Sequence, residues 1–523
     1  MTVSRRELLR ASALLGASGA LLGASGALTA CTSSDPGRQA LNAALGPRRR
    51  GGVLRIGVTG GSEADGLDPH HPPTYPDQAR VSNLYEPLFG RDAAYNIEPV
   101  LAESMEPSEQ GRVWTLRLRA GVSFHNGKPL DVDDVVFTLK RIVDQPGTGA
   151  AALAIVDMAG LRKVDARTLR IPLNQPYALF QDDLAQYYMA IVPVGFSLAH
   201  PVGTGPFRFG SFAPGRTSSF PRYEHYWRTG EPYVDELVIV DHPSDDANVE
   251  ALLGGAVDAI ANLPPAQIPD VKAAGGTVLI SESGAWNPFT MRVDRPPFND
   301  VRVRQAFRLI VDRDAMVSQV LAGQGRVAND LYAPFDPAYS TELPQRTQDV
   351  AKAKTLLRQA GHQNLRVELV TSAGIGPGTV AAANLFATQA KAAGVEIQVT
   401  TVDSGRFYAG KDYLNWVFAQ DYWYTRNYLP QVAQGSLPDA PFNECHWKDP
   451  NFINLVKQAQ GELNTTKRTQ LLKEAQKLEY NTGGYIIWGF KNQVDAYSTK
   501  VTGFVPDRNL PLSSFQFRTI SFV

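Results

Sequence analysis

The sequence predicts an α/β protein made of several structural units, and two observations carry this prediction. Residues 365–370 alternate like a strand, residues 379–393 have a helical pattern that ends at Gly394, and residues 395–402 are again strand-like. This succession is the βαβ rhythm of an α/β unit. A length of 523 residues suggests roughly three structural units at about 150 residues each. The chain is long enough to bury more than one core.

Composition narrows the possible classes of protein further. The chain has 51 Lys and Arg against 52 Asp and Glu, 43% apolar residues, 9% aromatic residues and two cysteines. These values exclude a disordered chain, a collagen-like chain and a disulfide scaffold. A formal net charge of -1 gives no electrostatic reason to expect a nucleic-acid partner.

The first thirty residues are typical of an export signal. Arg5 and Arg6 precede a weakly apolar run over residues 11–30, and Leu-Thr-Ala leads to Cys31. The paired arginines resemble a twin-arginine signal, and Leu-Thr-Ala-Cys resembles a lipoprotein box in which the cysteine is acylated. An uncleaved anchor helix is the alternative, but four glycines dilute the run.

The predicted mature chain is therefore held at the membrane by lipidated Cys31 alone. No other stretch of 18 or more apolar residues occurs, so no spanning helix is expected. Residues 31–50 are rich in Ser, Pro, Gly and Arg and are predicted to form a tether. With Cys31 acylated, Cys445 has no partner for a disulfide.

The first half of the mature chain alternates strand and helix patterns. Residues 51–59, 113–119 and 168–173 are predicted strands, and residues 203–209 are predicted to be a glycine turn that enters another. Asp131 is placed to cap a helix over residues 132–142, whose apolar residues share one face.

Capping residues at helix starts and glycines at helix ends also mark the helices predicted in the second half of the chain. Asp300 precedes a helix with apolar residues at 303, 307 and 310, and the helix over residues 350–360 stops at Gly361. The Asp449-Pro450 pair opens another helix, and residues 467–479 form the next. Residues 485–490 are strand-like, and strand-like pieces continue to residue 517.

Motifs for catalysis or metal binding are weak. Residues 121–129 resemble a phosphate loop, but five residues separate the two glycines where the motif has four. Pro129 also stands where the motif has a Ser or Thr to bind magnesium. His70 and His71 lack recognisable third and fourth metal ligands, so a solvated loop pair is favoured. Cys445 lies beside His446, but catalytic thiols normally meet their histidine through the fold, so a structural cysteine is favoured. We expect no cofactor, no metal and no enzyme activity.

The most informative local feature is a group of aromatic residues around Asp421. The group consists of Trp416, Tyr422, Trp423, Tyr424 and Tyr428. Aromatic rings supply contact area, and a carboxylate among them could pair with a cation in a desolvated pocket. An aromatic core strand is the alternative. Successive aromatic residues point to both faces of a strand, so some must be exposed or lie in a cleft.

Several segments together resemble an extracytoplasmic solute-binding protein of the peptide-binding family (family 5, dipeptide, oligopeptide and nickel type) of ABC importers. The segments that carry the resemblance are residues 67–70 (LDPH), 83–88 (NLYEPL), 101–104 (LAES), 116–127 (LRLRAGVSFHNG), 133–137 (DDVVF), 203–207 (GTGPF), 297–306 (PFNDVRVRQA), 312–313 (DR) and 351–361. They occur in the family's order and span nearly all of residues 51–517.

The resemblance implies a two-lobed periplasmic-binding-protein-like fold with two hinge crossings and a ligand enclosed between the lobes. Lobe I is expected at residues 51–285 and 491–523, with an extra subdomain inserted at about 78–195. Lobe II is expected at residues 286–490, with crossings near Trp286 and Phe490.

The resemblance also implies ligand-binding residues. In peptide-binding relatives an Asp in a Trp-x-x-x-Asp-Tyr-like segment holds the ligand's α-amine, and residues 416–422 here read WVFAQDY, which gives that role to Asp421. Trp286, Asn287 and Tyr85 match cleft positions of the family, and Trp416, Tyr422 and Trp423 belong to the aromatic group. Relatives often continue with Asp-Pro, whereas this chain continues with WYTRNY, so peptide length is left open. Arg426 could pair with a ligand carboxylate or with a surface acid.

The expected function is capture of a short peptide or peptide-like solute, without chemistry, and its delivery to ABC permease and ATPase subunits. The protein is expected to act as a monomer on the outer face of the cell membrane or in the periplasm. A sugar, opine or nickel chelate on the same scaffold is one alternative, for which His70 and His71 are the only support. A secreted surface hydrolase is an alternative of another class, although no catalytic set has recognisable spacing.

Overall fold

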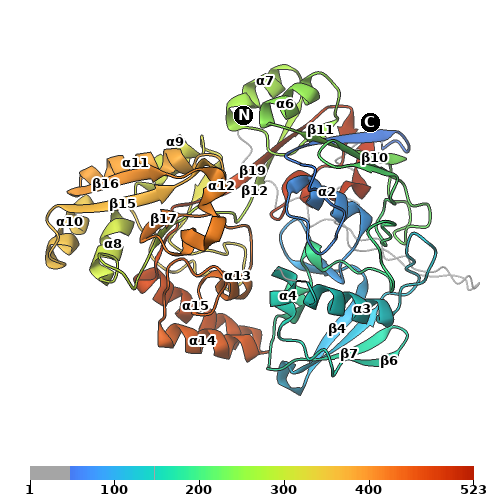
Figure 1. Ribbon diagram of the computed structural model, residues 1–523, viewed down its shortest axis with the longest axis horizontal. Coiled ribbons are helices and arrows are strands. Elements are labelled where there is room, and N and C mark those ends of the chain that lie inside the picture. The colour runs from blue at the N-terminus through green and yellow to red at the C-terminus, as the bar shows by residue number, and fades with distance from the viewer. Residues whose placement is uncertain (1–47, 146–147) are drawn as a thin grey trace, which may run out of the picture. The chain divides into compact units, whose positions relative to one another are not determined.

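The computed structural model describes residues 48–145 and 148–523 (Figure 1). The predicted export signal, Cys31 and most of the predicted tether lie outside this part of the chain. None of the helices in the described part is long and apolar enough to cross a membrane.

Lobe I, as we use the name, is the part built on the largest sheet together with the second sheet described below. Its strands run in the order β12 (Thr277–Glu282), β19 (Gly489–Tyr497), β11 (Ala259–Ile260), β1 (Val53–Thr59), β10 (Glu236–His242), β9 (Thr217–Pro221) and β8 (Ser211–Ala213). The predicted strand at 51–59 thus becomes the parallel neighbour of β10 and β11. The helices α2 (Tyr75–Leu84), α6 (Asp245–Leu253) and α7 (Ile268–Ala273) pack on this sheet.

A second sheet in the first half of the chain has its own hydrophobic core. Its strands run in the order β4 (Ala102–Ser108), β5 (Val113–Leu118), β7 (Thr168–Pro172) and β6 (Arg162–Asp165). The helices α3 (Val132–Val143), α4 (Thr148–Leu153) and α5 (Phe180–Asp183) pack against it, followed by the short helix η2 (Tyr187–Met189). The hairpin β2 (Phe89–Arg91) and β3 (Ile97–Pro99) precedes it, and η1 (Glu109–Gly111) joins β4 to β5.

Lobe II is built on a five-stranded sheet. Its order is β16 (Val395–Thr401), β15 (Leu365–Thr371), β17 (Phe418–Gln420), β13 (Phe289–Met291) and β18 (Tyr485–Ile486). Its helices are α8 (Val301–Ile310), α9 (Arg313–Val320), α10 (Val350–Gln359), α11 (Thr379–Lys391), α12 (Ser404–Phe407), α13 (Tyr428–Gly435), α14 (Pro450–Gly461) and α15 (Thr465–Thr482). The predicted βαβ unit is present, because β15 and β16 pair in parallel on either side of α11.

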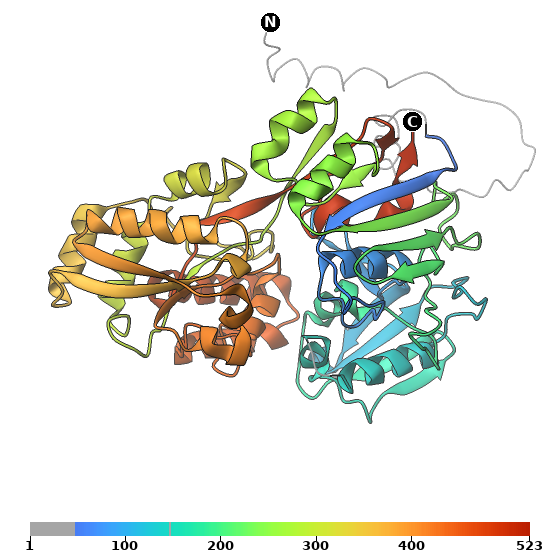
Figure 2. The ribbon, with the colours of Figure 1, turned by 45° about the horizontal axis from the view of Figure 1, so that its top comes forward.

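Strand β19, drawn in red in Figure 2, pairs with segments that lie far apart in the chain. Residues 489–491 pair with β14 (Gly325–Val327), which belongs to the middle of the chain, and residues 492–497 pair with β12. The chain then ends in β20 (Val501–Thr502), α16 (Pro511–Ser514), η6 (Phe517–Thr519) and β21 (Ser521–Phe522). The remaining short helices are η3 (Pro265–Gln267), η4 (Ala373–Ile375) and η5 (Ala409–Leu414).

The predicted helix caps are present. Asp131 and Asp134 form a reciprocal capping box at the start of α3, and Asp300 accepts the backbone N–H of Arg302 at the start of α8. Asp449 caps α14 with Pro450 as its first residue. These local side-chain contacts are short-range, which is why the sequence pattern predicts them.

The segment at residues 203–209, predicted to be a glycine turn that enters a strand, bends at residues 204–206, and β8 begins at Ser211. Within the segment, Phe207 forms an isolated bridge with Arg222. Its glycines also pack directly on the backbone that ends α2: a Cβ on Gly203 would lie 2.0 Å from the carbonyl oxygen of Leu84. The glycines therefore allow a close backbone approach as well as the turn.

Candidate functional site

The segment from Asp421 to Asn427 follows β17 and has two distinct faces. Asp421, Trp423 and Thr425 are buried, whereas Tyr422 and Arg426 are half-buried and Tyr424 is exposed. Side chains alternate along extended backbone, so one face points into lobe II and the other is open. We call Tyr422, Tyr424 and Arg426 the open face.

Asp421 lies on the buried face, where it is already hydrogen-bonded. Its Oδ1 accepts hydrogen bonds from the hydroxyl of Tyr408 at 2.6 Å and from the backbone N–H of Tyr422 at 2.8 Å. Its side chain also shares a hydrogen bond with Glu444, a buried carboxyl that accepts a hydrogen bond from Tyr485. Asp421 is only 5% exposed.

Asp421 and Glu444 form a pair of carboxyl groups in a low-dielectric setting. Burial raises the pKa of Asp421, although hydrogen bonds from Glu444 and Tyr408 oppose the rise. Burial, and next the charge of Asp421, raise the pKa of Glu444 well above its ordinary range. Two adjacent carboxyls cannot both ionise readily, so Asp421 ionises first and Glu444 keeps its proton to a higher pH.

Stacked aromatic rings support the buried face of segment 421–427. The ring of Trp286 is stacked between Tyr332 and Trp423, with centroid distances of 5.6 and 5.9 Å. Trp286 and Trp423 also exchange backbone hydrogen bonds, and Asn287 donates to the carbonyl oxygen of Asp421 at 3.2 Å. Trp286 is 1% exposed, so its ring supports the segment and presents no face to solvent.

On the open face, Arg426 has no acidic partner within the described residues. Its guanidinium lies 5.7 Å from the ring centroid of Trp423, and no carboxylate in the described chain pairs with it. Tyr422 and Tyr424 pack edge to face at 5.3 Å beside it. Of the two partners that the sequence suggested for Arg426, the surface acid is thus absent from the described part of the chain.

Lobe I brings three more tyrosines to the open face: Tyr75 at the start of α2, and Tyr187 and Tyr188 in η2. Burial raises the pKa of Tyr75, and the neighbouring phenols of Tyr424 and Tyr422 raise it further. Burial raises the pKa of Tyr188 to about 12, and the charge of Arg426 opposes this rise. Arg426 likewise lowers the pKa of Tyr187 against the effect of burial. Tyr187 and Tyr188 thus lie near Arg426, and Tyr75 lies near Tyr422 and Tyr424.

Direct contacts join the lobes beside this tyrosine-lined region. The amide of Asn427 donates to Asp182 at 2.5 Å, and Asp182 is also paired with Arg91. The hydroxyl of Tyr95 donates to the carbonyl oxygen of Thr425 at 3.0 Å. The contacts of Asn427 with Asp182 and of Tyr95 with Thr425 thus each join lobe I to lobe II.

Two of the expected site residues have other surroundings. Tyr85 is 2% exposed in the core of lobe I, where its hydroxyl donates to the carbonyl oxygen of Leu67. Trp416 is half-buried and packs on Phe407 at 4.6 Å. The structure therefore groups Asp421, Tyr422, Trp423 and Arg426 in one segment with Trp286 and Asn287 beneath it, and places Tyr85 elsewhere in a core.

The histidine pair offers no metal site in the described part of the chain, where no group of three or more His, Cys, Asp or Glu residues could hold an ion. Both ring nitrogens of His70 are engaged: Nδ1 with Arg141 at 2.5 Å and Nε2 with the carbonyl oxygen of Ala190 at 2.9 Å. Burial lowers the pKa of His70 to about 4, so the ring is neutral. Nε2–H therefore donates to Ala190, and Nδ1 accepts from Arg141.

Cys445 is buried, and burial raises the pKa of its thiol well above the ordinary value. Because the thiolate is the reactive form, we expect this thiol to stay unmodified in the folded protein. In the full chain carrying Cys31→Ser, Ellman's reagent should react only after guanidinium chloride is added. A Ser197→Cys control, at an exposed position, should react at once. Rapid reaction of Cys445 in the native protein would contradict this burial.

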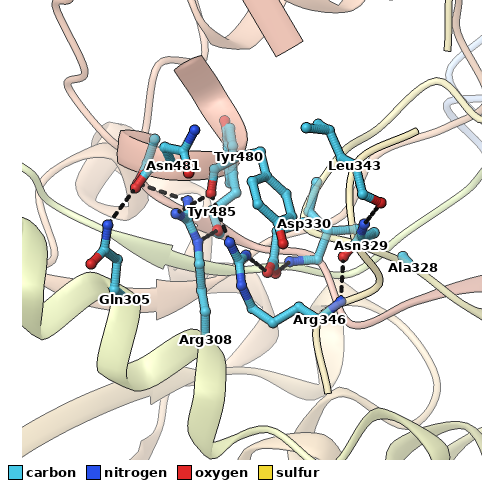
Figure 3. Close-up of polar contacts among 12 residues, drawn as sticks. Gln305, Arg308, Ala328, Asn329, Asp330, Leu343, Arg346, Tyr480, Asn481 and Tyr485 are labelled. Atoms are coloured by element: carbon cyan, nitrogen blue, oxygen red, sulfur yellow. Dashed lines mark hydrogen bonds and ion pairs between the residues drawn. The ribbon is translucent and has the colours of Figure 1, made fainter. Parts of the chain in front are cut away.

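Beneath the site, a network of arginines fixes the strand that carries Tyr485 (Figure 3). Arg308 is fully buried and donates to four backbone carbonyls at the end of α15 and the start of β18, among them those of Tyr480 and Tyr485. Asp330 pairs with Arg313 at 2.7 Å and with Arg346, and its Oδ1 accepts the backbone N–H of Ile487 at 3.0 Å. The position of β18 thus depends on buried ion pairs.

The sequence prediction missed five residues near Asp421 or the open face: Tyr75, Tyr187, Tyr188, Tyr408 and Glu444. The adjacent tyrosines at 187 and 188 and the acid beside Cys445 were visible, but nothing local indicated that they meet segment 421–427.

Comparison with known proteins identifies relatives over most of the chain. Residues 96–437 match the model of the bacterial extracellular solute-binding proteins, family 5. The glutathione-binding protein GsiB of Pectobacterium atrosepticum is 26% identical over 477 residues, covering 86% of this chain and 91% of GsiB.

Two solved structures share the fold at lower identity. The substrate-binding protein CtaP of Listeria monocytogenes has a TM-score of 0.81 and 20% identity over 91% of this chain and 100% of its own. The periplasmic binding protein DppA of Helicobacter pylori, solved with the peptide STSA, has a TM-score of 0.75 and 21% identity over 91% of this chain and 98% of its own. The predicted two-lobed α/β fold class is confirmed by these similarities.

Proposed function

Because the chain belongs to family 5 of the bacterial extracellular solute-binding proteins, we propose that it captures a short peptide or peptide-like solute outside the cytoplasm and delivers it to an ABC importer. The observation that carries the proposal is Arg426. It is a cation on the open face, it has no ion-pair partner among the described residues, and it lies in the same segment as the acidic pair at Asp421. A zwitterionic peptide offers the two complementary charges.

In this proposal, Asp421 holds the ligand's α-amine and Arg426 its carboxylate. Because Asp421 ionises before Glu444, Asp421 is the carboxyl of the pair that supplies the negative charge for an ammonium group. The tyrosines of both lobes supply aromatic walls that tolerate varied side chains, with water completing the polar contacts.

Closure of the lobes would follow from ligand contacts on both sides. A ligand that touches both lobes favours the closed state, because only there does it gain its full set of contacts. The hydrogen bond from Asn427 to Asp182 is formed in the same approach. We assign residues 51–285 and 491–523 to lobe I, with the inserted subdomain at about 78–195, and residues 286–490 to lobe II.

The remaining steps rest on the family and on the N-terminal motifs. We propose that Cys31 carries the lipid anchor after twin-arginine export, and that the protein acts as a monomer with ABC permease and ATPase subunits. The solute is bound and released without a chemical step.

A thermal-shift panel with the full chain carrying Cys31→Ser tests the proposal. We expect stabilisation by di-, tri- or tetrapeptides of about 2.7 kcal/mol at about 100 times the dissociation constant. N-acetylation or C-terminal amidation of the same peptides should each remove most of the shift, because each deletes one charge. Glutathione belongs in the panel as a peptide with two carboxylates.

Oligosaccharides, opines and nickel chelates at matched concentration are the comparison ligands. A shift with one of these and none with peptides would overturn the peptide assignment. Continuing turnover of a bound peptide would overturn the assignment as a binding protein.

A further inference from the structure

A cavity of about 570 Å³ lies beside Arg426, between the inserted subdomain and lobe II. Its lobe I wall comes from α4, residues 174–177 and the α5–η2 region, and its lobe II wall comes from α13 and the loop that follows it. Ligand pockets in proteins usually have volumes of about 300–1,000 Å³. The cavity is therefore large enough to hold part of a solute.

Two contacts between the lobes bound this cavity. Asn427 donates to Asp182 next to Arg426, and the backbone N–H of Ala178 donates to the carbonyl oxygen of Gln460 at 2.6 Å. Arg426 and Gln460 themselves line the cavity. The space thus lies beside these contacts, and it is open to solvent where its lining residues Ala151, Ala433 and Pro441 are exposed.

The cavity is continuous with the tyrosine-lined region through Arg426 and Tyr188. Both residues line the cavity, and their electrostatic interaction places Tyr188 within reach of Arg426. A ligand carboxylate on Arg426 would therefore sit at the mouth of the cavity, and the side chain of the same terminal residue is the nearest group able to enter it.

The walls favour a sizeable side chain with some polar character. Ala151 and Ala433 leave open space on opposite walls, and Leu437 and Pro430 add apolar surface. Asp183 lines the lobe I wall, hydrogen-bonded to Tyr177. The lining of the cavity therefore combines apolar surface from Leu437 and Pro430 with one polar group, Asp183.

We propose that this cavity receives the side chain of the C-terminal residue of a bound peptide, and so selects for a large residue at that position. The proposal rests on the proposed function, because it presupposes that Arg426 holds the ligand's carboxylate.

Calorimetry with tripeptides that differ only in the last residue tests the selection. With the full chain carrying Cys31→Ser, Ala-Ala-Tyr and Ala-Ala-Gln should bind at least about tenfold more tightly than Ala-Ala-Gly, the factor expected for burying one side chain. Ala433→Trp fills the cavity from α13 and should remove this preference by weakening Ala-Ala-Tyr while leaving Ala-Ala-Gly unchanged. Ala151→Trp should do the same from the opposite wall.

Ala381→Trp is the matched control, because Ala381 is exposed on α11 and does not line the cavity. It should keep the wild-type preference. Equal binding of all three tripeptides by the wild type, or a preference that survives both cavity-filling variants, would overturn the inference while the peptide assignment stands. Binding of no peptide at all would overturn both.

Discussion

Replacing Asp330 by Ala should lower the free energy of unfolding by about 3–5 kcal/mol, the cost of removing one partner from a buried ion pair. The side chain of Asp330 is fully buried, and that of Arg313, 2.7 Å away, is 2% exposed. The substitution leaves the guanidinium groups of Arg313 and Arg346 without their carboxylate and leaves the backbone N–H of Ile487 without its acceptor. Denaturant unfolding followed by tryptophan fluorescence measures the loss.

Glu342→Ala is the matched control. Glu342 pairs with Lys473 at 3.0 Å, but both side chains are exposed, at 54% and 36%. Exposed pairs contribute about 0–1 kcal/mol, so this variant should unfold almost like the wild type. Similar losses from both variants would contradict the role given to the buried network.

The pH dependence of this contribution has a definite sign. Burial opposes ionisation of Asp330, but the charges of Arg313 and Arg346 outweigh it, so its pKa lies below the ordinary value. A carboxyl with a depressed folded pKa stabilises the protein above its unfolded pKa and loses that effect as pH falls through the folded pKa. The deficit of Asp330→Ala should therefore stay constant from neutral pH down to about pH 4 and shrink only below it.

Local signals explain which parts of the fold are predictable from the sequence. The cap at Asp131 and the Asp449-Pro450 start depend on residues within one helical turn, and the parallel pair β15 and β16 depends on one βαβ unit. The turn at residues 203–209 was predictable, but the close approach of its glycines to the backbone of Leu84, more than a hundred residues away in sequence, has no local signal.

The candidate site was predictable only in part, for the same reason. The aromatic run identifies segment 421–427, and alternation predicts that it has two faces. Which face is open depends on Trp286, Tyr332 and Tyr485, which fill the space behind Trp423. Tyr75 and Tyr188 reach the segment from lobe I, and no local pattern encodes that approach.

Replacing Asp421 by Asn should weaken binding of amine-bearing peptides by at least about 30-fold, since removing one partner of a buried charge pair costs about 2–5 kcal/mol. The amide keeps the size of the side chain and can still accept from Tyr408, so the loss reports the charge. Glu444→Gln is the matched control. Its amide can still donate to Asp421 and accept from Tyr485, so peptide binding should remain within a few fold of the wild type, in line with a neutral Glu444 at neutral pH.

The same pair should make binding sensitive to pH. Burial raises the pKa of Asp421, so the carboxylate that holds the amine is neutralised at a higher pH than an exposed aspartate. Peptide affinity should therefore fall as pH is lowered from about pH 8 to about pH 4, and the fall should begin at a higher pH than it would for an exposed Asp, whose pKa is about 3.9. Asp421→Asn should bind weakly at every pH in this range, because it has no charge to lose. Calorimetric titrations of a tripeptide across this range measure the dependence, and a flat profile for the wild type would show that the amine is held by another group.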